Sequence, residues 1–365
     1  MKKIFVSLII ILLIDIVSSN LYFKKKDLWH YDGFVDHYWR ISSKIYHHDL
    51  LPNINVIEPW GRTFKKKLIT NSLGFRDFTN RIISKKSNKK RVLLIGDSAI
   101  EGAGYDYQFT LGGSLQKHLE KNHEVLNSAV GSYSPSIYYA KVNYFIQKGY
   151  KFDQAIIFLD PSDVIDELFI NHDENKNIIV PPISNKDKFV NLYLDNSLIF
   201  RNLLIFTDNV ENLKNFFKLK YKASKKFGKS FFKTTPEDTM FYRMTHVDRS
   251  AWTFDDTLFK NYKTGLEESE YYLSKLFNLL NSNNVEAYFV LYPHPSQIFY
   301  KDKFHEPYWS EWAKNNQIKL INLYPKFEGT NKRKIILDTF IFGDLHWNKK
   351  GTQIIFDSLI KEINF

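Results

Sequence analysis

The stretch Arg91–Gly104, RVLLIGDSAIEGAG, places a serine where a nucleophile would be useful. Val92–Ile95 has the apolar character of a strand buried on both faces, as in a parallel sheet. Gly96 then turns the chain, so that Ser98 comes out at the carboxyl end of the strand, where open α/β sheets bind their ligands. Ser98 is therefore either a nucleophile on a sharp turn or only the N-cap of the next helix.

A serine nucleophile needs a base within hydrogen-bond reach and a third group that orients the base. Near the end of the chain, FGDLHWNKKG places His346 two residues after Asp344, just before the last predicted helix. That loop would lie at the same edge of the sheet as Ser98. We therefore predict Ser98 as the nucleophile, His346 as the general base and Asp344 as the group that fixes the imidazole tautomer.

The elements that would position these residues alternate along the chain. Strands are predicted at 92–95, 125–130, 155–159, 286–292 and 319–323, and helices at 111–121, 135–149, 266–280, 308–315 and 351–363. This order is typical of an α/β fold with a parallel, doubly wound sheet. We divide the chain into a signal anchor or signal peptide (1–23), an N-terminal extension (24–90), a catalytic domain (91–170 and 265–365) and an inserted cap (171–264).

The first residues are typical of a targeting segment. Lys2 and Lys3 precede an apolar run of eleven residues, Ile4–Ile14. That length suits a signal peptide, whereas a spanning helix needs about twenty residues, and mostly apolar character does continue to Phe23. We expect a membrane anchor or a cleaved signal, with the rest of the chain outside the cytoplasm in either case.

Composition excludes several classes of protein. The chain has no cysteine, which excludes disulfides, thiolate catalysis and a thioether lipid anchor. The net charge is +11, but only nine of the 51 basic residues are arginine and no basic helix stands out, so we predict no nucleic-acid partner. A basic surface favours an anionic envelope or an acidic polysaccharide instead. We predict no cofactor and no metal, since His47-His48 stands alone and Asp160, Asp163 and Asp166 are typical of a solvated acidic loop.

IGDS after the first strand and DLHWN before the last helix together resemble the SGNH (GDSL-type) hydrolase family. The resemblance covers roughly residues 90–170 and 266–365. It implies a flavodoxin-like three-layer α/β/α sandwich and the activity of an esterase, lipase, or carbohydrate O-acetyl hydrolase or transferase. NSLGFRD (71–77) resembles the lead-in of envelope-polysaccharide relatives, and the Asp-x-His-Trp order resembles the alginate acetyltransferase branch.

The resemblance also implies an oxyanion hole, in which this chain departs from the family pattern. The family's second block is a glycine after the second strand; here Gly131 comes one place early and Ser132 stands at the expected position. The third block is normally an asparagine, and Ser162 stands in its place. Losing one oxyanion donor reduces the rate by roughly 10²–10³. The incomplete oxyanion hole therefore leaves two alternatives, a slow enzyme and a catalytically inactive relative.

Substrate contacts are predicted at the same edge of the sheet. His294 and Gln297 in LYPHPSQ follow the fourth strand, and Asp163 follows the third, although each also fits a structural turn. In the insertion, the residues that could line a carbohydrate cleft are Tyr242, Arg243, His246 and Trp252, with core packing as the alternative for Trp252. We predict an O-acetyl ester hydrolase or transferase acting on envelope carbohydrate, with a membrane acyl-donor protein as a possible partner. The alternative is an inactive carbohydrate-binding or assembly protein.

Overall fold

The computed structural model describes residues 2–26, 39–60, 64–180, 196–246 and 248–365. The chain forms two compact units. The first comprises Met1–Tyr38, Val56–Lys66 and Pro181–Thr239, and the second comprises Trp39–Asn55, Lys67–Val180 and Met240–Phe365.

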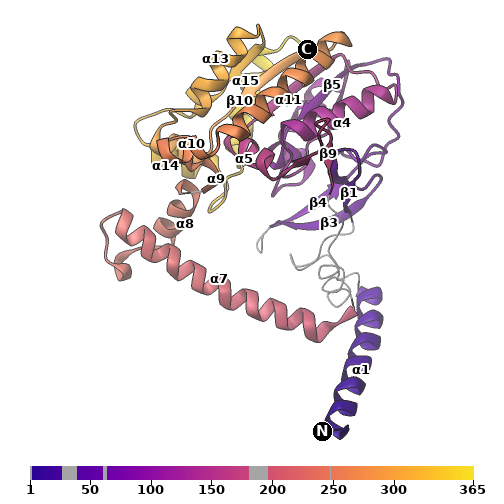
Figure 1. The fold of residues 1–365 in the computed structure, drawn as a ribbon, viewed down its shortest axis with the longest axis vertical. Helices are drawn as coiled ribbons and strands as arrows, with labels where there is room; N and C mark the ends of the chain where they lie inside the picture. Colours follow the sequence, from indigo (N-terminus) through magenta and orange to yellow (C-terminus); the bar gives the residue numbers. More distant parts are fainter. Residues whose placement is uncertain (1, 27–38, 61–63, 181–195, 247) are drawn as a thin grey trace. The chain divides into compact units, whose positions relative to one another are not determined.

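The second unit is built on a five-stranded parallel sheet in the order β11-β10-β7-β5-β6 (Figure 1). Its strands are β5 (Lys90–Ile95), β6 (His123–Asn127), β7 (Gln154–Leu159), β10 (Glu286–Leu291) and β11 (Lys319–Asn322). Every residue of β7 is buried, and so is all of β5 after Lys90, as expected for strands covered on both faces. The prediction of an α/β fold with a parallel sheet is therefore confirmed.

Helices cover both faces of this sheet. On one face, α11 (Lys263–Ser282) packs against α4 (Pro135–Gln147) and α5 (Pro161–Phe169), and Phe277 of α11 contacts Trp312 of α13 (His305–Asn315). On the other face, α3 (Leu111–Leu119) packs against β6 and against α15 (Lys349–Glu362). The chain moves in one direction from β5 to β6 and in the other from β6 through β7 and β10 to β11, so right-handed crossovers place these helices on opposite faces.

Several short elements were not predicted. They include α2 (Ser98–Glu101), α12 (Pro295–Tyr300), α14 (Lys332–Thr339) and the antiparallel pair β1 (Arg40–Ser43) and β2 (His47–Leu50). A second two-stranded sheet joins β3 (Asn55–Trp60) to β4 (Phe64–Ile69). Gly74 (φ 79°) closes the turn after β4, where its N–H donates to the Asn71 carbonyl at 3.0 Å.

The first unit contains two long helices, α1 (Lys2–Lys26) and α7 (Leu198–Lys226). Buried Asp15 of α1 holds the start of α7, because its carboxylate accepts hydrogen bonds from the Ser197 hydroxyl and, at 3.2 Å, from the Ile199 N–H. Among the described residues, no helix combines the length and hydropathy needed to cross a membrane. The membrane anchor therefore stays a prediction.

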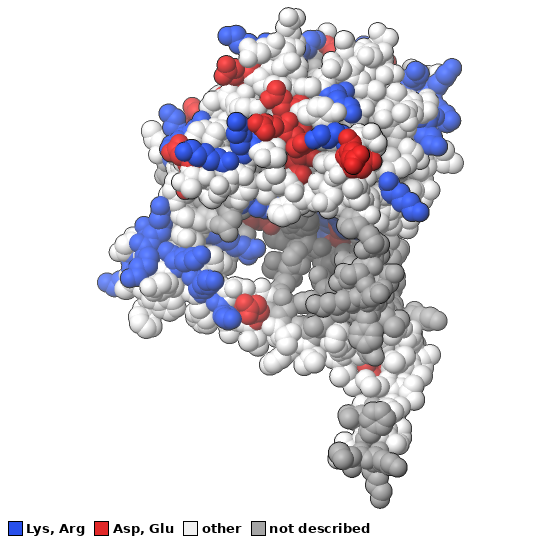
Figure 2. Space-filling model, viewed as in Figure 1, with Lys and Arg blue, Asp and Glu red and all other residues white. Residues whose placement is uncertain are grey.

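Basic and acidic side chains are mixed on the face shown in Figure 2. The densest group of basic side chains on this face lies over the last turns of α7, where Lys218, Lys220, Lys222, Lys225 and Lys226 follow one another. Lysines thus account for the basic charge, and on the second unit they are interspersed with carboxylates.

Candidate active site

Ser98, His346 and Asp344 lie in one hydrogen-bonded chain. Ser98 is the first residue of α2, directly after the carboxyl end of β5, and its Oγ lies 2.8 Å from His346 Nε2. His346 Nδ1 in turn lies 2.5 Å from Asp344 Oδ1. Asp344 also accepts the backbone N–H of His346 at 3.0 Å, which fixes the short loop before α15. This is the geometry that general-base activation of a serine hydroxyl requires.

The charges around the hydrogen-bonded residues Ser98, His346 and Asp344 suit His346 as a general base. Burial disfavours the imidazolium, but the hydrogen bond to Asp344 and its charge, with Asp97 and Asp160 nearby, leave the pKa of His346 above its ordinary value. Burial opposes ionisation of Asp344, yet the hydrogen bond and charge of His346 hold the pKa of Asp344 well below its usual range. Asp344 is therefore a carboxylate that accepts the hydrogen bond of Nδ1–H, which leaves the Nε2 lone pair directed at Ser98.

Asp97 is a second acceptor for the serine hydroxyl. Its Oδ2 lies 3.0 Å from Ser98 Oγ, and its Oδ1 accepts the N–H of Ala99 at 2.9 Å, which caps α2. Burial and the charge of Asp160 raise the pKa of Asp97 to about 6. When His346 carries two protons, its Nε2–H points at Ser98, and the serine can then donate its hydrogen to Asp97.

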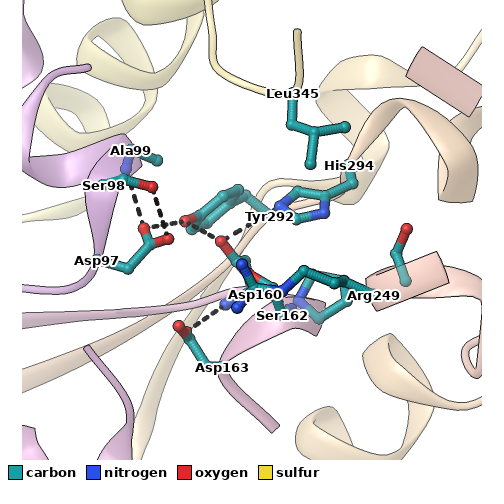
Figure 3. A network of polar contacts seen from close by, with 12 residues as sticks. Asp97, Ser98, Ala99, Asp160, Ser162, Asp163, Arg249, Tyr292, His294 and Leu345 are labelled. Atoms are coloured by element: carbon teal, nitrogen blue, oxygen red, sulfur yellow. Dashed lines mark hydrogen bonds and ion pairs between the residues drawn. The ribbon is translucent and has the colours of Figure 1, made fainter. Parts of the chain in front are cut away.

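Behind Ser98, a buried polar network joins the carboxyl ends of three strands (Figure 3). The Tyr292 hydroxyl lies between Asp97 and Asp160, 3.4 Å from Asp97 Oδ1 and 2.9 Å from Asp160 Oδ2. His294 Nε2 lies 3.2 Å from the same Asp160 oxygen. Burial opposes ionisation of Asp160, but His294 and Ser162 stabilise its charge, so the pKa of Asp160 lies well below its usual range. This network fixes the floor of the site.

Asp163 belongs to this floor. It is buried, and its Oδ2 accepts the backbone N–H of Asp160 at 2.9 Å. Burial and the charges of Asp160 and Asp97 raise the pKa of Asp163 well above its usual value. The carboxylate oxygens of Asp97, Asp160 and Asp163 come within 4.8 Å of one another. In this arrangement Asp163 faces protein groups, and its predicted contact with substrate stays a prediction.

Two groups that were predicted to donate to the oxyanion already donate to carboxylate oxygens of the protein. The Ser162 hydroxyl donates to Asp160 Oδ1 at 2.6 Å, and the Gly131 N–H donates to Glu101 Oε2 at 2.8 Å. A role for Ser162 in the oxyanion hole would require its hydroxyl to rotate away from Asp160. Gly131 does lie beside the nucleophile, since a Cβ built on it would be 3.4 Å from Ser98 Cβ.

Ser132 is the remaining donor on that turn. Its side chain is exposed, and its φ of 62° lies in the left-handed region that favours glycine. Within the described part of the chain, the backbone N–H groups of Ser132 and Ser98 have no hydrogen-bond acceptor. These two N–H groups are the best candidates for binding an oxyanion.

The residues that hold the turn containing Gly131 and Ser132 were not predicted from the sequence. Glu101, which is 1% exposed, is paired with Arg40, whose Nη2 lies 2.8 Å from Glu101 Oε1. His48 Nε2 lies 2.8 Å from the Gly131 carbonyl oxygen. Arg40 and His48 come from the β1–β2 pair, far from the motifs along the chain, and no local pattern marks them as partners of Gly131.

The NSLGFRD segment holds the loop that follows α2. Buried Arg76 donates from Nη1 to the carbonyls of Glu101 at 2.7 Å and Gly102 at 2.5 Å, and from Nη2 to that of Tyr105. Asn71 closes its own turn by accepting the N–H groups of Leu73 and Phe75. The segment thus supports α2, whose first residue is Ser98, through the last residue of that helix and the loop that follows it.

Three other residues that were predicted to contact substrate are buried. His294 and Gln297 are 5% and 2% exposed, and the Gln297 side chain accepts the His294 N–H at 2.9 Å. Trp252 is fully buried and donates from Nε1 to the Pro161 carbonyl at 3.0 Å, which fits its core-packing alternative.

In the insertion, the ring of His246 stacks on that of Tyr242 at 3.8 Å, and its Nε2 bonds the Tyr300 hydroxyl. Arg243 is exposed. Whether these residues contact a carbohydrate stays a prediction.

A cavity of about 340 Å³ opens where β10 and β11 end. Pro293 and Gln297 form one wall, and the charged and amide side chains in its lining are Lys301, Asp302, Glu306, Asn322, Glu328 and Lys332. Gln297 Nε2 donates to Asp302 at 3.0 Å, so this wall is fixed by hydrogen bonds. The cavity follows the same strand end as His294, its lining mixes apolar with polar side chains, and Ser98, His346 and Asp344 are not among its lining residues.

No family model matches this sequence, and no curated protein matches it either. In a comparison of folds, 28 chains of solved structures match. The psychrotrophic esterase EstA from Pseudoalteromonas sp. is 11% identical, with a TM-score of 0.37, over 76% of this chain and 96% of its own. A GDSL-like lipase from Bacteroides thetaiotaomicron is 9% identical, with a TM-score of 0.39, over 76% and 90%. The lipase/acylhydrolase from Enterococcus faecalis is 10% identical, with a TM-score of 0.37, over 75% and 95%. Because the TM-scores and identities are this low, the case for function rests on the geometry of the site alone.

Proposed function

We propose that this chain is a serine ester hydrolase or acyltransferase of the SGNH (GDSL-type) kind. The observation that carries the proposal is the Ser98–His346–Asp344 chain, with 2.8 Å and 2.5 Å between its members, at the carboxyl end of a parallel strand. A nucleophile, an oriented base and two backbone N–H groups beside them are the minimum for acyl transfer through a covalent intermediate.

The reaction proceeds in two halves. Ser98 Oγ attacks the ester carbonyl while His346 Nε2 takes its proton, and the resulting oxyanion is held by the N–H groups of Ser98 and Ser132. The leaving alcohol then takes the proton from His346, which leaves an acyl-serine. In the second half, His346 removes a proton from water or from a sugar hydroxyl, which attacks the acyl group, and His346 then returns the proton to Ser98 Oγ as the acyl–serine bond breaks.

The proposed substrate is an O-acylated carbohydrate of the cell envelope. The Asp-x-His-Trp order at Asp344–Trp347 and the NSLGFRD segment, which resemble envelope-polysaccharide relatives, support this class. We place the protein outside the cytoplasm, tethered or released at its N-terminus, with a membrane acyl donor if transfer is the reaction. Both reactions use the same acyl-serine and differ only in the acceptor.

The test is labelling with a fluorophosphonate probe, which reacts with an activated serine. The wild type should be labelled, and Ser98→Ala should not, because the acylated atom is gone; Ser87→Ala, at an exposed serine, is the matched control. Acetyl release from a model ester, with and without an oligosaccharide acceptor, then separates hydrolysis from transfer. Labelling that persists in Ser98→Ala would contradict the proposal.

A second candidate is an inactive carbohydrate-binding protein with the same fold. It is favoured by the engagement of Ser162 with Asp160 and of Gly131 with Glu101, which leaves fewer oxyanion donors. Well-folded wild-type protein that resists the probe yet binds an acetylated glycan would support this candidate.

A further inference from the structure

We propose that His48 is a positioning residue that sets the direction of the oxyanion-binding N–H of Ser132. The inference rests on the proposed function and adds a residue from the N-terminal part of the second unit to the machinery. His48 does not touch the reacting atoms; it acts through the peptide group that joins Gly131 to Ser132.

The geometry follows from the planarity of the peptide bond. In a trans peptide, the carbonyl of one residue and the N–H of the next lie in one plane and point in opposite directions. His48 Nε2 lies 2.8 Å from the Gly131 carbonyl oxygen, so this hydrogen bond fixes the plane and directs the Ser132 N–H away from His48. Gly131 lies beside Ser98, and the Ser132 side chain is exposed, so the N–H is presented at the open edge of the site.

The proton needed for this hydrogen bond is in place at neutral pH. A carbonyl can only accept, so His48 must carry its hydrogen on Nε2. Burial lowers the pKa of His48 to about 4, so the ring is neutral and its Nδ1 is an acceptor. His47 Nδ1 lies 2.8 Å from that atom and can supply the matching donor. The pair therefore fixes the His48 tautomer.

His48 is itself held firmly to the turn that it orients. The Tyr133 hydroxyl donates to the His48 carbonyl at 2.7 Å, and the two rings meet edge to face at 4.9 Å. The next residue, Asp49, forms a buried pair with Lys141 at 2.7 Å, and Lys141 also donates to the Ser128 carbonyl at 2.9 Å. The strand that carries His48 and the turn after β6 are thus one bonded assembly.

Glu101 and Arg40 fix the other side of the same residue. Glu101 Oε2 accepts the Gly131 N–H at 2.8 Å, and the guanidinium of Arg40 holds both oxygens of Glu101, at 2.8 Å and 3.2 Å. Gly131 therefore has its N–H held by one group and its carbonyl by another. With both ends fixed, the following N–H has little freedom to turn.

The kinetic test compares His48→Leu with His48→Gln on a model acetyl ester in the full-length protein. Loss of the donor should lower kcat roughly 10²-fold with KM little changed, because an oxyanion contact exists only in the transition state. Glutamine can donate from its Nε2 and should restore most of the rate. Lys44→Leu, at an exposed position in the same segment, should behave as the wild type.

A spectroscopic test is independent of turnover. The sequence contains two Gly-Ser pairs, Gly131–Ser132 and Gly113–Ser114. Protein labelled with carbonyl-¹³C glycine and ¹⁵N serine therefore gives two correlated NMR signals. We expect the Gly131 carbonyl to move upfield in His48→Leu and to stay in place in His48→Gln, with Gly113 in α3 as the internal reference.

The outcomes separate the inference from the proposed function. A Gly131 signal that does not move in folded His48→Leu, or a kcat of His48→Gln no better than that of His48→Leu, overturns the positioning role. If the Gly131 signal moves as expected but the wild type shows no Ser98-dependent turnover, the orientation of the peptide by His48 stands and the proposed enzymatic function fails. If His48→Leu does not fold, His48→Gln is compared with the wild type. A Gly131 signal that moves in folded His48→Gln, or a kcat that falls by roughly 10², then overturns the positioning role.

Discussion

At the scale of single residues, the protonation of His346 decides the reactivity of Ser98. The hydrogen bond and charge of Asp344 outweigh burial and keep the pKa of His346 above its ordinary value of 6.5. Below that pKa, Nε2 carries a proton and donates to Ser98 instead of accepting from it. The serine then turns its hydrogen toward Asp97, 3.0 Å away, and is not a nucleophile.

This gives a direction for the pH dependence. The value of kcat/KM on a model ester should rise with pH and level off, with an apparent pKa above 6.5, because only the neutral imidazole can act. Asp344→Asn removes the charge that raises the His346 pKa, so the inflection should move to lower pH. The plateau should also fall by roughly 10⁴-fold, since an amide favours the wrong tautomer. A pH profile that is the same in the two proteins would argue against this role of Asp344.

At the scale of elements, the one-turn helix α2 cannot hold its own shape. It has four residues, too few for a stable helix, and it is held by the Asp97 cap before it and by Arg76 after it. Buried Arg76 donates to the carbonyls of Glu101, Gly102 and Tyr105, so it replaces the hydrogen bonds that a longer helix would make.

We expect Arg76→Met to destabilise the protein by about 3 kcal/mol or more, because each buried carbonyl left without a donor costs roughly 1–3 kcal/mol. The comparison variant is Arg81→Met, just after the NSLGFRD segment. Arg81 is 29% exposed and donates to one backbone carbonyl, and Asp77 keeps the donors of Asn71 and Gln116 without it, so its loss should cost less than that of Arg76. Urea unfolding of both variants measures the difference, and equal losses would show that Arg76 is not the principal anchor of this loop.

At the scale of the whole molecule, the buried carboxylates beneath the site make stability depend on pH. The pKa of Asp163 is raised well above its usual value in the folded protein by burial and by the charges of Asp160 and Asp97. Between the unfolded and folded pKa values, the folded state holds a proton that the unfolded state has lost. Stability due to this group is therefore complete at low pH and declines as pH rises toward the folded pKa.

Asp163→Asn should flatten that decline. An amide has no proton to lose, and its oxygen can still accept the Asp160 N–H. Relative to the wild type, the variant should gain up to about 1.4 kcal/mol per pH unit above pH ~4 until the folded pKa is passed. Urea unfolding across this range measures the gain; Asp357→Asn, on the surface helix α15, is the control. Stability curves that run parallel for Asp163→Asn and the wild type would contradict the assignment of a raised pKa to Asp163.

Much of this architecture was predictable because it is local. The buried runs that became β5, β7 and β10 and the helices between them follow from hydrophobic patterning. The meeting of Ser98 with His346 was predicted from Ser98 at the end of a strand and His346 in the loop before the last helix. The order of the strands does not follow from pattern alone. The choice of Ser132 over Gly131 as the oxyanion donor depends on two structural facts. Ser132 has a φ of 62°, and Glu101 already accepts the Gly131 N–H. The contact of His48 with Gly131 joins residues 83 apart, which no motif spacing encodes.

The placement of β1 and β2 in the same compact unit as the sheet has a practical consequence for anyone who trims this gene. The sheet begins at Lys90, and a truncation placed there would keep both the IGDS and the DLHWN motifs. It would also remove Arg40, which pairs with Glu101, and His48, which donates to the Gly131 carbonyl. Arg76, which holds the loop after α2, would be lost as well. An expression fragment meant to test catalysis should begin upstream of Trp39, and inactivity of a shorter one would say nothing about Ser98.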